Sequence, residues 1–104
     1  MADMPEKDWR FLRSIQDMLI ERLSERLNAE IAAILSRRDL TARAKRVKVH
    51  EAAQRHYRIV AECFDHWKRS NIWLACRAMV KHGVFEEIDL AALTAETAEH
   101  IQSM

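Results

Sequence analysis

The chain has 104 residues, and its 17 lysines and arginines are balanced by 16 aspartates and glutamates. That length allows one domain over residues 1–104, and a single glycine and a single proline argue against β-hairpins, phosphate-binding loops and flexible linkers. With 49% apolar residues the chain is too hydrophobic to be disordered, and its apolar runs are too short to cross a membrane. We therefore predict an all-α protein. Because no signal peptide is visible and there are two cysteines, we expect it in the cytoplasm.

The first predicted helix covers about residues 5–36. Its apolar residues recur every three or four positions from Trp9 to Leu35, which is the pattern of an amphipathic helix. A turn follows at residues 37–39, after which Asp39 or Thr41 is placed to cap the next helix.

A second stripe of the same spacing predicts a helix over about residues 40–82. Gly83 is a suitable C-terminal cap for it, and Ser70 and Asn71 favour a bend near residues 68–71 because they form helices poorly. Residues 84–103 then form a short helical head, in which Thr94 is the expected N-cap of the last helix.

The apolar stripes of the two long helices are too wide for one small monomer to bury. Large apolar surface left in water marks an association site, and a symmetric pair is the simplest way to cover it. We therefore expect a homodimer with the long helices in its interface. The residues predicted to form this interface or the core are Trp9, Leu12, Leu19, Leu23, Phe64, Trp67 and Leu74.

Charge is distributed unevenly along the chain. Residues 37–58 contain eight basic and two acidic residues, whereas residues 83–104 contain five acidic residues and no lysine or arginine. The basic segment is interpreted either as a solvated helix face or as a patch that receives an acidic partner. A nucleic-acid-binding helical dimer that uses Arg37–Arg58 is the alternative function. Its near-neutral total charge and acidic last helix disfavour that alternative.

Sites for metal or catalysis are not predicted. Cys63 and His66 share a helical face, but Cys76 lies about 20 Å further along a straight helix, so four zinc ligands cannot meet. No glycine-rich turn presents a nucleophile, and the dinucleotide and phosphate-loop fingerprints are absent. We expect no metal, no cofactor and no enzymatic activity.

A family resemblance extends over roughly residues 45–101. It is carried by Val47-Lys48-Val49-His50-Glu51, Cys63-Phe64-Asp65, Arg69-Ser70, the apolar stretch Ile72–Val80, Lys81-His82-Gly83-Val84, Glu87-Ile88-Asp89-Leu90 and Leu93-Thr94-Ala95-Glu96, which leads to Ile101. In this half the chain resembles the fluorescence recovery proteins, and we identify it as a divergent member of that family.

The resemblance implies a dimeric, non-enzymatic protein without a cofactor. Members of this family bind the photoactivated orange carotenoid protein and speed its return to the resting state. The resemblance therefore implies a protein partner, either a carotenoid-binding protein or another protein. By position, His50 matches the family's histidine, Glu51 stands in place of its aspartate and Val47 in place of its tryptophan. With Arg55 and Tyr57, these residues are the predicted partner-binding set.

Overall fold

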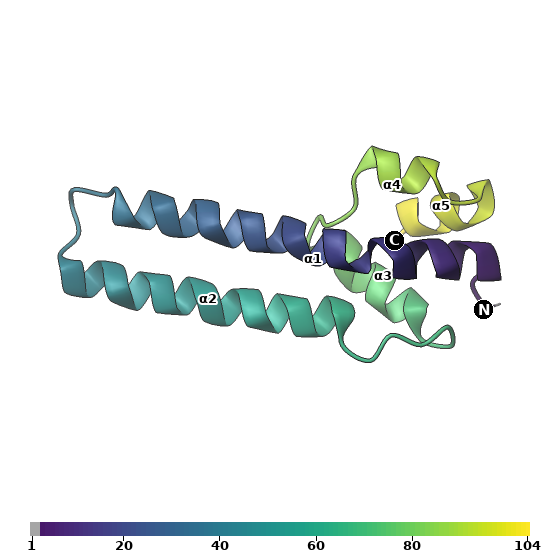
Figure 1. Cartoon of the computed structure of the whole chain (residues 1–104), viewed down its shortest axis with the longest axis horizontal. Coiled ribbons are helices and arrows are strands. Elements are labelled where there is room, and N and C mark those ends of the chain that lie inside the picture. The colour runs from purple at the N-terminus through teal and green to yellow at the C-terminus, as the bar shows by residue number, and fades with distance from the viewer. Residues whose placement is uncertain (1–2) are drawn as a thin grey trace.

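The computed structural model describes residues 3–104; Met1 and Ala2, which belong to the expected domain, lie outside the described residues. Its helices are α1 (Glu6–Leu35), α2 (Ala42–Phe64), α3 (Ile72–Lys81), α4 (Glu87–Ala91) and α5 (Ala95–Gln102). No strand occurs over this range, so the all-α prediction is confirmed. Figure 1 shows a long α1–α2 hairpin, with α3, α4 and α5 gathered around the N-terminal half of α1. The molecule measures 52 × 24 × 23 Å.

The free end of the hairpin is closed by local hydrogen bonds. Thr41, one of the two predicted caps, accepts a hydrogen bond from the Ala44 backbone N–H at 3.1 Å and so begins α2. Lys45 Nζ donates to the Leu35 carbonyl at 2.8 Å, which satisfies one of the unpaired carbonyls at the end of α1. The connection between the two helices is therefore short and is fixed to both of them.

The expected helix over residues 40–82 is interrupted, and the predicted bend is a complete break. Asp65 adopts an extended conformation (ψ 135°) and His66 a left-handed one (φ 58°), so the helical hydrogen-bond ladder stops. Asn71 satisfies the freed backbone: its Oδ1 accepts from the Lys68 N–H at 2.9 Å, and its Nδ2 donates to the His66 carbonyl at 3.1 Å. The chain can therefore turn back and lay α3 against the hairpin.

The predicted caps at the other end of α3 and at α5 are confirmed. Gly83 has φ 62°, and the N–H of Val84 donates to the Met79 carbonyl at 2.9 Å, as in a Schellman motif. Thr94 accepts from the Thr97 N–H and caps α5.

Most of the predicted core residues are buried. Leu12, Leu19, Leu23 and Phe64 are at most 6% exposed. Trp9 and Trp67 are half-buried and pack on this core, with their ring centroids 6.4 Å apart. Leu74, predicted to lie in the core or in a dimer interface, is not a core residue, and its place in an interface stays a prediction. It is 71% exposed, because the buried side of α3 is formed by Ile72, Ala75, Cys76, Ala78 and Met79.

The buried carboxylate of Asp8 fastens α5 to the start of α1. One of its oxygens accepts from the Thr94 N–H at 2.9 Å, and the other accepts from the hydroxyls of Thr94 at 2.7 Å and Thr97 at 2.5 Å. Burial opposes ionisation, but the hydrogen bonds from Thr97 and Thr94 outweigh it and hold the pKa of Asp8 below its ordinary value. The head is thus joined to α1 by an ionised group.

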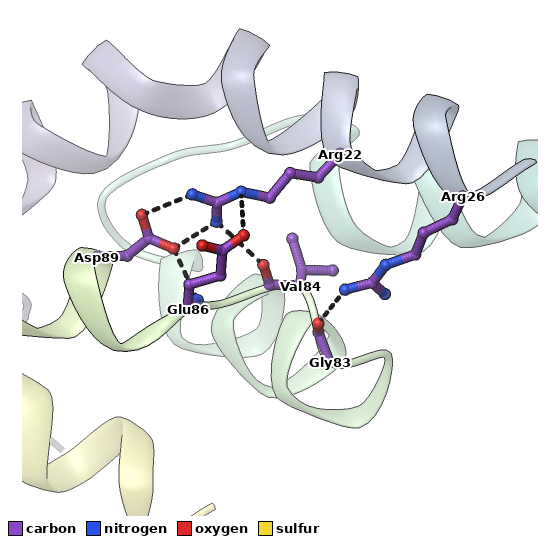
Figure 2. A network of polar contacts seen from close by, with 6 residues as sticks. All are labelled: Arg22, Arg26, Gly83, Val84, Glu86 and Asp89. Carbon is purple, nitrogen blue, oxygen red and sulfur yellow. Dashed lines mark hydrogen bonds and ion pairs between the residues drawn. The ribbon is translucent and has the colours of Figure 1, made fainter. Parts of the chain in front are cut away.

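A second buried carboxylate fastens α4 to the middle of α1. Figure 2 shows the Arg22 guanidinium reaching both oxygens of Asp89, at 2.5 and 3.1 Å, and also contacting Glu86 and the Val84 carbonyl. Although Asp89 is buried, its hydrogen bonds from Arg22 keep its pKa below the ordinary value. One turn further along α1, Arg26 donates to the Gly83 carbonyl. Together these contacts fix the α3–α4 segment against α1.

Candidate functional site

Four of the five predicted partner-binding residues lie on one surface, which we name the outer face of α2. His50 and Glu51 lie three and four residues after Val47, and Tyr57 lies seven residues after His50, a spacing that puts the four side chains within about 120° of one side of a helix. All four are exposed, Val47 to 42% and Tyr57 to 72%. The buried residues of α2, such as Ala52 and Cys63, point elsewhere, so this surface faces away from α1.

Arg55 is the fifth predicted residue, and it serves a different contact. Its guanidinium binds both carboxylate oxygens of Glu30 on α1, at 2.9 and 3.1 Å. An exposed ion pair of this kind contributes little stability, but it draws Arg55 away from the outer face and toward the neighbouring helix. Glu30 is 25 residues away in sequence, and no local pattern indicates this pairing.

The outer face offers hydrogen-bonding groups that the chain itself leaves unused. Over residues 3–104, the side chains of His50 and Glu51 make neither a hydrogen bond nor an ion pair, and the Tyr57 hydroxyl makes no hydrogen bond. The Tyr57 ring rests edge-on against His56, with centroids 5.9 Å apart. An exposed tyrosine is the kind of residue that anchors a protein interface.

A second surface lies along the hairpin, on the side away from the head. We name it the open hairpin face, and it is formed by Ile20, Ile31, Val49, Ala53 and Val60, all only half-buried. On each helix these residues lie more than about 100° around the axis from the residues that mark the head side, namely Arg22 and Arg26 on α1 and Arg55 on α2. Figure 1 shows that α4 and α5 lie beyond α1, away from α2.

The free end of the hairpin is strongly basic. We name residues 37–48 the basic tip, because they contain six basic residues and one acid. Arg37 is paired with Asp39 at 2.5 Å, and Lys45 is bound to the α1 terminus. Within the described part of the chain the other four basic residues form no ion pair; they are Arg38, Arg43, Arg46 and Lys48.

The cysteines are placed as apolar core residues. Cys63 and Cys76 are both fully buried and unpaired. Burial raises the pKa of the Cys63 thiol to about 11 and that of Cys76 to about 12. Both thiols therefore stay protonated at neutral pH, a state in which they are poor nucleophiles and poor metal ligands. Among residues 3–104, no three His, Cys, Asp or Glu side chains come together as a metal site.

Comparison of the chain with protein-family models, with curated proteins and with solved structures finds no match. In residues 3–104, none of the helices combines the length and the apolar character needed to span a membrane. The candidate binding surfaces of the protein are the three described above: the outer face of α2, the open hairpin face and the basic tip.

Proposed function

We propose that this protein is a non-catalytic modulator of another protein, resembling the fluorescence recovery proteins, and that it binds its partner through the outer face of α2. The observation that carries the proposal is that Val47, His50, Glu51 and Tyr57 share one exposed surface whose polar groups are unused within the described chain. A tyrosine, an imidazole and a carboxylate on one surface provide area, hydrogen bonds and charge for recognition.

A binder of this kind changes its partner's conformation through a difference in affinity. If the outer face binds one conformation of the partner more tightly than another, the equilibrium shifts by that difference and by no more. If it binds the transition state best, it also speeds the return to the resting form. No bond needs to be made or broken on this protein, which agrees with its buried, protonated cysteines.

We propose further that the open hairpin face is the interface of a homodimer. The occupant we assign is a second copy because the chain carries complementary charges at its two ends. Four basic residues of the basic tip form no ion pair among the described residues, and Glu87, Glu96 and Glu99 of the head are likewise unpaired, since Arg22 already binds Glu86 and Asp89. Two hairpins packed antiparallel bring the basic tip of one copy toward the acidic head of the other, as in a four-helix bundle.

The partner is tested with the orange carotenoid protein that the family resemblance implies. The dark recovery rate of the photoactivated carotenoid protein is measured with and without an equal concentration of this chain. We expect faster recovery, which Tyr57→Ala reduces at least about fivefold because it removes an interface anchor. Ile88→Ala is the matched control, since Ile88 is also 72% exposed but lies on α4. Unchanged recovery with the wild-type chain would reject the carotenoid protein as partner.

The dimer is tested by light scattering at micromolar concentration. We expect about twice the chain mass of 12.2 kDa for the wild type and the single-chain mass for Ile31→Asp, which places a charge in the open hairpin face. Met18→Asp is the control, because Met18 is a 44% exposed residue of α1 outside that face. A wild-type monomer at this concentration contradicts the proposal.

The basic tip supports nucleic-acid binding as a second candidate function. Its four unpaired basic residues are available to phosphates, and such binding weakens steeply as salt rises. Titration with duplex DNA at about 50 mM salt tests it. Absence of binding there rejects this candidate and leaves the protein-binding proposal intact.

A further inference from the structure

The break between α2 and α3 creates a groove that the sequence pattern does not reveal. Where α3 turns back along the end of α2, a groove of about 470 Å³ opens between them. Trp67, Ala75 and Ala78 line it with apolar atoms, and Leu74 stands at its edge with 71% of its surface exposed. No other side chain of residues 3–104 buries most of that leucine. We name this feature the α2–α3 groove.

Among the described residues, the charged side chains that line the groove leave one cation, Arg77 on α3, and one carboxylate, Asp65 at the end of α2, without an ion pair. Glu62 is already engaged by Lys81 at 3.5 Å and by His82 at 3.0 Å, and the hydrogen bond from His82 lowers the pKa of Glu62. Arg77 lies on the same face of α3 as Leu74, three residues further on, and forms no ion pair within the described residues. The α3 side of the groove therefore presents an apolar surface next to an unpaired positive charge.

The groove is continuous with the outer face of α2. Tyr57, Ala61 and Asp65 follow one another at intervals of four residues, so the exposed side of α2 runs from Tyr57 to Asp65, which lines the groove. A partner that is bound on the outer face can therefore extend into the groove without crossing the open hairpin face.

We propose that the α2–α3 groove seats an amphipathic helix of the partner protein, with its apolar side on Leu74 and a carboxylate on Arg77. The alanines at positions 75 and 78 make a shallow floor along α3, which allows a second helix to approach closely. Ten residues of α3 give a floor about 15 Å long, the length of about three turns of a bound helix. This inference rests on the proposed protein-binding function and extends its surface.

The proposal is tested with synthetic helical peptides of about 15 residues, fluorescein-labelled, that carry leucines at helical spacing. One peptide is flanked by glutamates and the other by lysines. We expect fluorescence anisotropy to report binding of the glutamate peptide and at least about tenfold weaker binding of the lysine peptide. Leu74→Asp and Arg77→Glu should each weaken the glutamate peptide about tenfold. Ile88→Asp, at an equally exposed position on α4, should leave its affinity unchanged.

Three results would overturn the assignment: no binding of the glutamate peptide, equal binding of both peptides, or unchanged binding by Leu74→Asp. Circular dichroism should show that Leu74→Asp folds normally, because the substituted side chain is mostly in water. If Leu74→Asp instead removes a tetramer seen by light scattering, the groove belongs to a second copy of this chain. The peptide assay contains no carotenoid protein, so its failure and failure of the recovery assay are separate results.

Discussion

The two ends of the hairpin are held together in different ways. At the head end, the buried carboxylates of Asp8 and Asp89 are each joined to groups more than 60 residues away in sequence. Around them lie Leu12, Leu19 and the buried side of α3. We call residues 24–62, the part of the hairpin beyond the head end, the arm. Only two residues of the arm are buried, Ile34 and Ala52. The head end completes its own core, and the arm does not.

This difference indicates which part of the molecule would be stabilised by the second copy that we propose. Two antiparallel helices bury only one side of each, and such a pair gains much of its stability from further helices packed on it. The later helices pack on α1 only as far as about Arg26 and on the end of α2, and so leave the rest of the hairpin without further helices. We therefore expect substitutions at the head end to change folding of the single chain, and substitutions on the open hairpin face to change association.

The largest effect is expected when the head-end core loses a side chain. Leu19→Ala removes a fully buried leucine and should lower the free energy of unfolding by about 3 kcal/mol, because a cavity remains. Met18→Ala, at the neighbouring 44% exposed position, should cost less than about 1 kcal/mol. Urea unfolding at one fixed protein concentration measures both. Equal losses would show that the core does not lie where we place it.

Next in size is the loss of the Arg22–Asp89 pair. Arg22→Ala leaves the carboxylate of Asp89 buried without its main partner and should cost about 2–3 kcal/mol. Amide exchange should quicken chiefly in α4 and α5, which this contact fastens to α1. Arg10→Ala, which breaks only the exposed pair with Glu6, should change stability by under about 0.5 kcal/mol. Uniform loss of protection over α1 and α2 would instead contradict a local role.

Much of the fold could be predicted from sequence because its signals are local. The spacing of Leu12, Leu19 and Leu23 predicts the buried side of α1, and the caps at Thr41 and Gly83 are single-residue signals. The exact break was not predictable in this way. It falls at Asp65 and His66, with neither glycine nor proline, where Trp67 packs on Trp9 and Phe64 and so fixes the chain through tertiary contacts.

The candidate site was only partly predictable for a related reason. Helical spacing is enough to place Val47, His50 and Tyr57 on one side of α2. It does not identify the partner of Arg55, which is set by how α1 lies beside α2. The α2–α3 groove likewise exists only because α3 reverses direction, which turns Leu74 outward.

Acid should lower the stability of the head end by a smaller amount, and the loss should grow gradually as the pH falls. The pKa of Asp8 is lowered in the folded state, so its contribution is fully present above the unfolded value of about 3.9. That contribution is lost as the pH falls through the lower, folded value. Tm measured from pH 7 to pH 2.5 should therefore fall below about pH 4. Asp8→Asn should start from a lower Tm at pH 7 and fall less. Identical slopes for the two proteins would exclude Asp8 as a cause.

The smallest expected effect compares the same residue type at both ends of the hairpin. Thr41 caps α2 at the basic tip with one hydrogen bond, whereas Thr94 caps α5 and also donates its hydroxyl to buried Asp8. Thr41→Ala should cost about 1 kcal/mol, the usual contribution of an N-cap, because water can reach the freed Ala44 N–H. Thr94→Ala should cost about 1 kcal/mol more, since it removes a hydrogen bond to a buried charged group. Urea unfolding of both variants decides the point: a larger loss for Thr41→Ala would mean that the arm, and not the head end, carries the stability of the chain.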